Sequence, residues 1–261
     1  MILKEFGYTE LPINFDKEKH MYELDGIPMV GVSSAKNMKH REFMTHWPIK
    51  EMYLFLASKW NVRGKYTRAE KLALLMEGKK AWRGKSKTAM AIGTTVHELI
   101  EKSIISGERY DPDVLHQLEC KEVSNGYKAF LAWEKAHKVE YLAVELIVGS
   151  REHYIGGTID VVAIVDGKFG ILDWKTSSML SNAEFLQTAP YRMMLHEGGI
   201  TDYVERRIVR LDKLTGKFEE YVITHDYNKD IEAFLCLLKV YRWDRDVNKK
   251  FADWNGKLKI N

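Results

Sequence analysis

Few cysteines and no long apolar runs occur in this sequence, and each shortage excludes a class of protein. Only two of the 261 residues are cysteines, Cys120 and Cys236, so a four-cysteine zinc site or iron–sulfur cluster cannot form. The two lie far apart in helical-looking contexts, and we expect them to be reduced thiols of the core. The longest apolar runs, such as residues 231–238, end well before the ~20 residues that a membrane-spanning helix needs.

The first residues, MILKEFG, lack an apolar signal-peptide core and a small-residue cleavage site, so we expect a cytoplasmic protein with no membrane partner. With 45% hydrophobic residues, 30% charged residues and only 5 prolines, the chain is neither collagen-like nor wholly disordered. Its length predicts one catalytic core with an appended lobe. We place an N-terminal hairpin and a basic helical lobe in residues 1–90, and the core with a C-terminal helix in residues 91–261.

Positive charge is concentrated in one segment, although the net charge of the chain is only +3. Residues 39–87 contain 13 Lys and Arg against 4 Glu, a local charge of +9, whereas the rest of the chain carries −6. Such a surface suits a polyanion, and tryptophans among the cations suit stacking on unpaired bases. The alternative is a solvated helix face whose tryptophans only pack. The candidate DNA-binding residues are Lys79, Lys80, Trp82, Arg83, Lys85 and Lys87.

Apolar periodicity and turn residues predict the order of the elements. A hairpin at 20–33 is followed by helices at 35–58, 66–79, 88–106 and 112–137. Strands at 139–148, 154–165 and 168–176 come next, then a helix at 182–196, strands at 203–211 and 218–224, and a final helix at 228–248. The predicted fold class is α/β (α+β), with a core order of α-β-β-β-α-β and a central mixed sheet flanked by helices. Pro190 predicts a late start or a kink in its helix.

The most informative stretch is the hairpin predicted around Asp166-Gly167, a dipeptide typical of a type I′ turn. Pairing Val165 with Lys168 sets a register that places Asp160 opposite Asp173. Like charges at such a position are destabilising unless a cation lies between them. Alternation along the strand also points Lys175 to the same face as Asp173. The neighbouring residues are apolar on both faces, so these charges are expected to be buried and to need a functional reason.

Carboxylate ligands without thiolates favour Mg²⁺ or Mn²⁺ over Zn²⁺. A cation held by two carboxylates lowers the pKa of a bound water and offsets charge on a phosphodiester. Lys175 is then placed either to orient that water or to stabilise the charge that develops on phosphorus. Glu145, on the preceding predicted strand, is a third candidate carboxylate, which either supports the ligands or pairs with Lys175.

Five motifs, which follow one another along the chain, resemble those of a known protein family. They are GTTVHE at 93–98, Glu145, GTID at 157–160, DWK at 173–175 and QTAPY at 187–191. With these motifs the chain resembles the PD-(D/E)XK nuclease superfamily, and most closely its RecB-type branch, which includes phage exonucleases and the mitochondrial genome maintenance exonuclease. The Pro-Asp of the superfamily's name is Ile159-Asp160 here.

The resemblance implies a role for each motif residue. It implies that His97, Asp160 and Asp173 bind the metal, with the Trp174 main-chain carbonyl as a further ligand. It also implies that Lys175 is catalytic and that Gln187 and Tyr191 support the site or touch DNA. The catalytic set is therefore Asp160, Asp173, Lys175 and Glu145.

These implications predict a Mg²⁺- or Mn²⁺-dependent deoxyribonuclease, exonucleolytic in mode, acting on single-stranded DNA or on the ends of duplexes. Two alternatives stay open. One is a catalytically silent DNA-binding module, against which the complete Asp, Asp, Lys set argues. The other is the nuclease subunit of an assembly with a helicase or recombination protein. No P-loop occurs in the sequence, so a motor would be another chain.

Overall fold

The computed structural model describes residues 2–39, 42–60, 64–224 and 226–257. The chain divides into two compact units. The first comprises residues 1–39 and 96–261, and the second comprises residues 40–95. The predicted boundary at residue 90 assigned the N-terminal hairpin to the lobe. In the structure the hairpin belongs to the first unit, because its second strand pairs with the core sheet.

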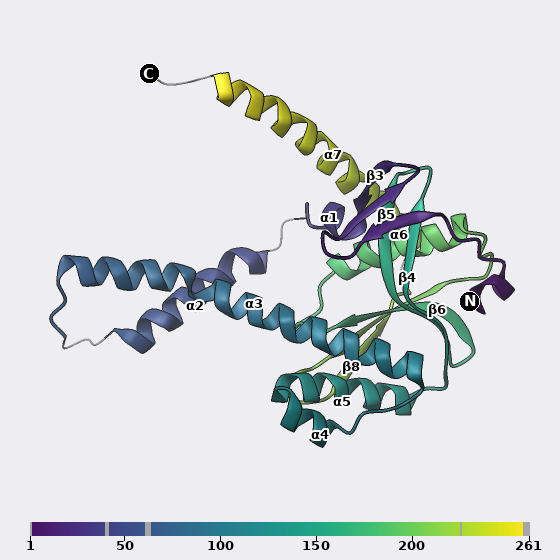
Figure 1. Ribbon diagram of the computed structural model, residues 1–261, viewed down its shortest axis with the longest axis horizontal. Helices are drawn as coiled ribbons and strands as arrows, with labels where there is room; N and C mark the ends of the chain where they lie inside the picture. Colours follow the sequence, from purple (N-terminus) through teal and green to yellow (C-terminus); the bar gives the residue numbers. More distant parts are fainter. Residues whose placement is uncertain (1, 40–41, 61–63, 225, 258–261) are drawn as a thin grey trace. The chain divides into compact units, whose positions relative to one another are not determined.

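One mixed sheet of eight strands organises the first unit (Figure 1). The path runs β1-β2-β3-β5-β6-β7-β8, and β4 pairs with β5 away from this path. The β3–β5 and β6–β7 pairs are parallel, and the other pairs are antiparallel. The strands are β1 (Ile13–Asp16), β2 (Met21–Leu24), β3 (Ile27–Gly31), β4 (Val139–Ser150), β5 (Ile155–Val165), β6 (Lys168–Lys175), β7 (Glu205–Leu211) and β8 (Phe218–Val222).

Two Asp-Gly dipeptides turn the hairpins of this sheet. Asp25-Gly26 joins β2 to β3 and Asp166-Gly167 joins β5 to β6, and all four residues have φ between 52° and 81°. A type I′ turn needs positive φ at both central residues, which Gly tolerates fully and Asp more easily than most residues. Both predicted hairpins are therefore confirmed, and Val165 pairs with Lys168 as the second turn requires.

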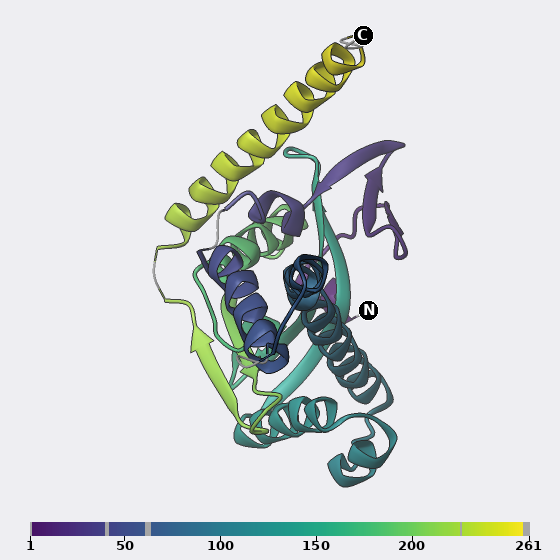
Figure 2. The same cartoon turned by 90° about the vertical axis from the view of Figure 1, so that its left-hand side faces the viewer.

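Helices cover both faces of the sheet (Figure 2). Trp174 of β6 packs against Phe130 and Trp133 of α5. Side chains alternate along a strand, so Asp173 and Lys175 face the other way, toward Tyr191 of α6. The helices of the unit are η1 (Ile2–Phe6), α1 (Val32–Lys36), α4 (Pro112–Leu118), α5 (Lys121–Ala136), α6 (Ala183–Glu197) and α7 (Tyr227–Lys257), together with the last residues of α3 (Arg68–Ser106).

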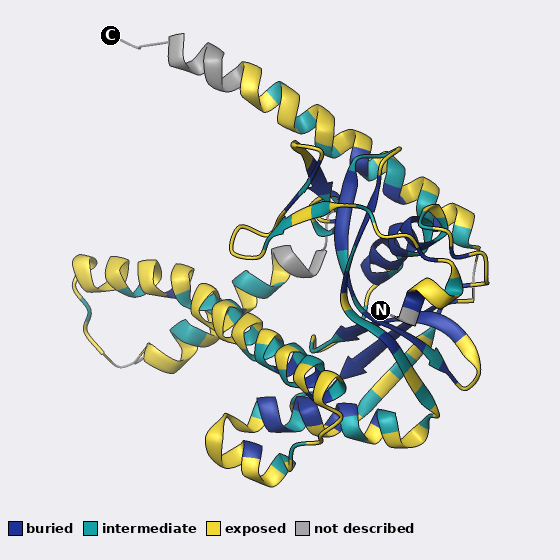
Figure 3. Ribbon diagram, turned by 45° about the vertical axis from the view of Figure 1, so that its right-hand side comes forward, coloured by how far each residue is buried: buried dark blue, intermediate teal, exposed yellow. Residues whose placement is uncertain are grey.

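The core order α-β-β-β-α-β is confirmed as α5-β4-β5-β6-α6-β7, the arrangement of a restriction-endonuclease-like fold. The helix predicted over 112–137 is instead two helices, because Glu119 and Cys120 have extended backbones. Pro190 lies inside α6. Most of the buried apolar side chains come from the strands, α5 and α6 (Figure 3), and the other helices and the connecting segments of the unit add the rest. Cys120 and Cys236 are free thiols but exposed, so the prediction that they belong to the core was wrong.

The second unit contains α2 (Glu42–Lys59) and most of α3. The helices predicted at 66–79 and 88–106 form one continuous helix, because residues 80–87 are mostly strong helix formers, interrupted by the single Gly84. Thr67 and Glu70 begin it with a reciprocal capping box. Gly78 lets α2 approach, since an added Cβ would lie 3.3 Å from Leu56 Cγ. No helix in the described ranges is long and apolar enough to cross a membrane.

Candidate active site

An opening at one edge of β5 positions the site. Along one edge this strand pairs with β4, and along the other it pairs with β3 at Ile155 and Gly156 and with β6 from Val161 to Val165. Between these two partners, no described strand pairs with residues 157–160 on that edge. Asp160 lies at the end of this opening, so its carboxylate stands where two strands diverge.

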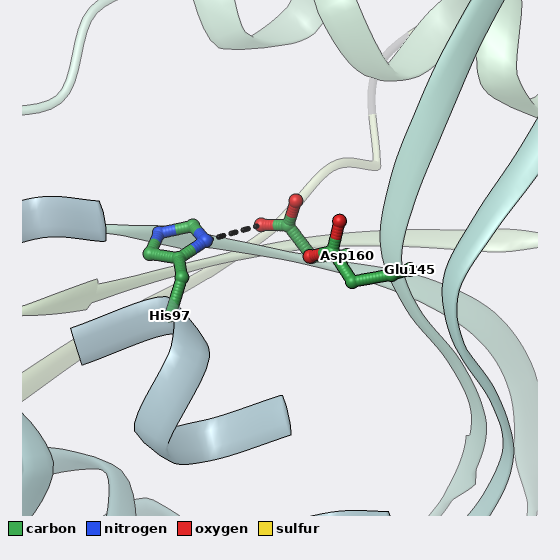
Figure 4. A group of neighbouring side chains, drawn as sticks. All are labelled: His97, Glu145 and Asp160. Carbon is green, nitrogen blue, oxygen red and sulfur yellow. Dashed lines mark ion pairs between the residues drawn. The ribbon is translucent and has the colours of Figure 1, made fainter. Parts of the chain in front are cut away.

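Three potential metal ligands converge at Asp160 (Figure 4). His97 comes from α3, Glu145 from β4 and Asp160 from β5, and one ligand atom of each lies within 4.8 Å of the others. The His97 Nδ1 atom is 3.7 Å from Asp160 Oδ2. Glu145 is exposed and the other two are half-buried, so solvent reaches the cluster. The structure brings together His97 and Asp160, which the resemblance implies as metal ligands, and places the third candidate carboxylate, Glu145, beside them.

Glu145 has an unusual backbone and an unusual carboxyl group. It has a φ of 47°, a left-handed conformation that residues other than Gly rarely adopt. The residues on either side of it, Val144 and Leu146, pair with Val161 and Ile159, so Glu145 faces Asp160 across the ladder. Although the residue as a whole is exposed, partial desolvation of its carboxyl group, and then the charges of Asp160 and Glu101, raise the pKa of Glu145 to about 7. Strain and a shifted pKa at one residue are typical of functional sites.

The Asp160 carboxylate accepts a backbone hydrogen bond from β6, in place of the backbone carbonyl of a paired strand residue. The β5–β6 ladder follows the predicted register from Val165–Lys168 to Val161–Leu172 and ends there. Two residues beyond Leu172, the Trp174 N–H donates to Asp160 Oδ2 at 2.8 Å. The predicted opposition of Asp160 and Asp173 as a ladder pair is therefore not formed, because the side chain of Asp160 satisfies the β6 backbone. This bond fixes the position of the carboxylate.

The buried Asp173 forms an ion pair with the half-buried Lys175 on the α6 face of β6. Asp173 is 2% exposed, and apart from this ion pair neither of its carboxylate oxygens accepts a hydrogen bond from a described residue. Burial raises the pKa of Asp173, while the positive charge of Lys175 opposes this rise. Burial also disfavours the Lys175 ammonium, but the carboxylates of Asp173 and Asp160 outweigh it and raise the pKa of Lys175. Lys175 therefore stays protonated at neutral pH.

Gly156 and Gly157 make room for two tyrosines on opposite faces of β5. A Cβ on Gly156 would lie 2.8 Å from the Tyr22 side chain, and one on Gly157 would lie 2.5 Å from Tyr191 Cε1. Tyr191 is buried, and its hydroxyl is 3.5 Å from Gln187 Nε2. Burial, and then the charges of Asp173 and Asp160, raise the pKa of Tyr191 well above its ordinary value. The structure thus places Gln187 and Tyr191 beside the carboxylates, where the resemblance expected them.

Sequence reasoning missed Lys36, the last residue of α1. It is 8% exposed, and its Nζ donates to Gln187 Oε1 at 2.5 Å. Its charge also acts on Asp173. No motif marks it, because a single lysine at the end of a short apolar segment is a common surface residue. The long-range contact with Gln187, 151 residues away, connects Lys36 to the candidate site.

The candidate DNA-binding residues of the lobe all lie on α3 in the second unit. Lys79, Lys80, Arg83, Lys85 and Lys87 are exposed. The half-buried Trp82 packs edge to face with Trp47 at 6.1 Å, and Arg83 lies over its ring. Lys85 pairs with the buried Glu51, so it also holds α2 to α3. Arg41 and Arg63, which contribute to the predicted basic segment, lie outside the described residues.

The residues of the cluster fit a divalent cation. Two carboxylates and an imidazole converge, and beside them the Asp173 carboxylate accepts no hydrogen bond from a described residue apart from its ion pair with Lys175. Oxygen and nitrogen donors without thiolates suit Mg²⁺ and, better with an imidazole, Mn²⁺. An uncompensated cluster of carboxylates is costly without such a charge.

Comparison with known proteins gives the family. The model of the PD-(D/E)XK nuclease superfamily matches residues 65–259. This range covers most of the chain and contains the site residues His97, Glu145, Asp160, Asp173 and Lys175. The chain therefore belongs to the PD-(D/E)XK nuclease superfamily, whose members hydrolyse phosphodiester bonds and typically use divalent metals. No match was found among curated proteins.

Proposed function

We propose that this protein is a Mg²⁺- or Mn²⁺-dependent deoxyribonuclease of the RecB-type branch, acting as an exonuclease on DNA strands. The observation that carries the proposal is the convergence of His97, Glu145 and Asp160 next to the Asp173–Lys175 ion pair. The family supplies the reaction class. The motif spacing supports the branch, and the basic, tryptophan-containing lobe supports a DNA strand as the substrate.

In this proposal His97, Glu145, Asp160 and Asp173 hold the cation, and the Trp174 carbonyl is a further ligand. Bound there, the cation would lower the pKa of a water molecule and offset the charge on the phosphodiester. Asp160 is kept in place by the Trp174 N–H, which spares reorganisation during the reaction. Because Lys175 stays protonated, it acts as a hydrogen-bond donor to the phosphate oxygens rather than as a base.

Hydrolysis of end-labelled DNA tests this function. Single-stranded and duplex substrates, labelled at either end, are incubated with the wild type in EDTA, Mg²⁺ or Mn²⁺. We expect release of short products from an end only with a cation. Asp160→Ala and Asp173→Ala should lose turnover by orders of magnitude. A circular substrate cut as fast as a linear one would refute the exonuclease mode, and inactivity on every DNA would refute the nuclease proposal.

Lys175→Met is expected to separate chemistry from binding. Because the ammonium acts on charge that develops in the transition state, turnover should fall by orders of magnitude while DNA binding persists. The variant also leaves Asp173 buried without its ion-pair partner, so the free energy of unfolding should fall. Lys175→Met combined with Asp173→Asn should regain stability but not activity. Wild-type turnover in Lys175→Met would show that this lysine is only an ion-pair partner.

A further inference from the structure

A buried lysine outside the predicted catalytic set borders the candidate site. Lys36 ends the short helix α1, which follows β3 directly, and only 8% of its surface is exposed. Lysine is rarely buried unless its ammonium group is held by polar partners. Here Nζ donates to Gln187 Oε1, which joins α1 to α6.

The contact extends into a line of polar groups beside the carboxylates. Gln187 presents its carbonyl oxygen to Lys36, so its amide nitrogen faces the Tyr191 hydroxyl. Tyr191 is packed against Gly157, three residues before Asp160. The positive charge of Lys36 also opposes the rise in the pKa of Asp173, with a smaller effect than that of Lys175. Asp173 therefore lies in the field of two ammonium groups, that of the buried Lys36 and that of the half-buried Lys175.

We propose that Lys36 is a positioning residue of the nuclease site, which fixes the Gln187 amide and supplies a second positive charge beside Asp173. The inference rests on the proposed function. The charged donor holds the Gln187 amide in one orientation, so the amide nitrogen keeps facing the Tyr191 hydroxyl. The side chains of Gln187 and Tyr191 therefore stay in one arrangement beside the carboxylates. Lys36 acts through Gln187 and Asp173 and does not itself contact DNA.

Lys39 provides a matched control. It lies three residues after Lys36, belongs to the same unit and also bonds to α6, through Asn182 at the helix start. Removing Lys39 deletes a contact between the α1 region and α6 without touching Gln187. A difference between the two lysines therefore separates a role in the site from a role in holding α6.

The experiment measures Mn²⁺ affinity, melting temperature and steady-state DNA hydrolysis for the wild type, Lys36→Met, Lys39→Met, Gln187→Met and the Lys36→Met/Gln187→Met double variant. In Lys36→Met we expect kcat to fall about 10- to 100-fold with little change in KM. Mn²⁺ should bind about 3-fold more tightly, because a repelling positive charge near the site is gone. Lys39→Met should match the wild type in kcat and in Mn²⁺ affinity, because Lys39 bonds to Asn182 and not to Gln187. Since Lys39 belongs to the basic segment 39–87, any effect of its loss on DNA binding is expected in KM alone. The double variant should turn over no more slowly than Gln187→Met, because the two residues act as one unit.

Opposite changes in turnover and Mn²⁺ affinity are the decisive result, since a purely structural defect would weaken both. Wild-type turnover in Lys36→Met, weaker Mn²⁺ binding, or a higher KM with unchanged kcat would each overturn the inference. Should Lys36→Met not fold, Lys36→Arg, which keeps the charge and the donors, must retain most of the turnover. A wild type that binds Mn²⁺ but hydrolyses no DNA would instead refute the proposed function, on which the role of Lys36 depends.

Discussion

At the scale of single residues, Glu145 couples proton binding to cation binding. Its pKa of about 7 lies above that of a free glutamate, so the folded protein holds a proton that the unfolded chain releases between pH 4.5 and 7. Without a cation, the contribution of Glu145 to stability is therefore greatest at low pH and is lost as the pH rises through 7. A cation reverses this dependence, because it binds the ionised carboxylate and displaces the proton.

We therefore expect Mn²⁺ to raise the melting temperature of the wild type more at pH 8 than at pH 6. Thermal unfolding with and without Mn²⁺ at the two pH values measures the difference. In Glu145→Gln the pH dependence should shrink, since the amide does not titrate. An equal Mn²⁺ effect at both pH values in the wild type would contradict the prediction.

At the scale of elements, the turn residues of the chain predict the local hairpins well. The rest of the sheet depends on pairing between strands that are distant in the sequence. The two Asp-Gly turns allowed the β2–β3 and β5–β6 hairpins and their register to be predicted. Nothing local indicates that β3 pairs in parallel with β5, more than a hundred residues later. That pairing carries α1, and with it Lys36, to the site. The union of two predicted helices into α3 reflects propensity across residues 80–87, where the strong helix formers outweigh the single Gly84.

For the candidate site, as for the fold, the local motifs could be predicted from the sequence, but contacts between distant segments could not. Motifs identified His97, Glu145, Asp160, Asp173 and Lys175, and alternation along β6 placed Asp173 and Lys175 on one face, as their ion pair confirms. The place of Glu145 could not be predicted, because it depends on a left-handed residue and a register shift within β4. A β-bulge shifts the strand register by one residue, and the alternation of apolar and polar residues in the sequence does not show where such a shift occurs.

The approach of α6 to β5 gives a prediction at this scale. Gly157→Ala would place a methyl group 2.5 Å from the Tyr191 ring, and the ring is buried and cannot move freely. We expect a loss of about 1 to 3 kcal/mol in the free energy of unfolding, measured with urea. Gly31→Ala, on the neighbouring strand, is the control, since its methyl group would meet nothing closer than 3.5 Å. Equal stability of the two variants would show that Tyr191 is not seated on Gly157.

At the scale of the whole molecule, charge is divided between the two units. The candidate metal ligands belong to the first unit, whereas most of the positive segment belongs to the second. Separate units can supply separate functions, with phosphate contacts in one and bond cleavage in the other. Phosphate contacts carry no base information, so they should favour all sequences alike.

This division predicts the salt dependence of DNA affinity. Each phosphate contacted on a single strand adds roughly −0.7 to the slope of log affinity against log salt. The informative variant replaces Lys79, Lys80, Arg83 and Lys87 with Gln and keeps Lys85, because Lys85 also neutralises the buried Glu51. We expect weaker binding and a flatter slope in fluorescence anisotropy titrations, with unchanged cleavage of a very short oligonucleotide at saturation. Trp82→Phe is the companion variant. It keeps an aromatic ring against Trp47 and should leave the slope unchanged. An unaltered slope in the four-fold variant would mean that the basic stretch of α3 is a solvated helix face, and that DNA reaches the site by another surface.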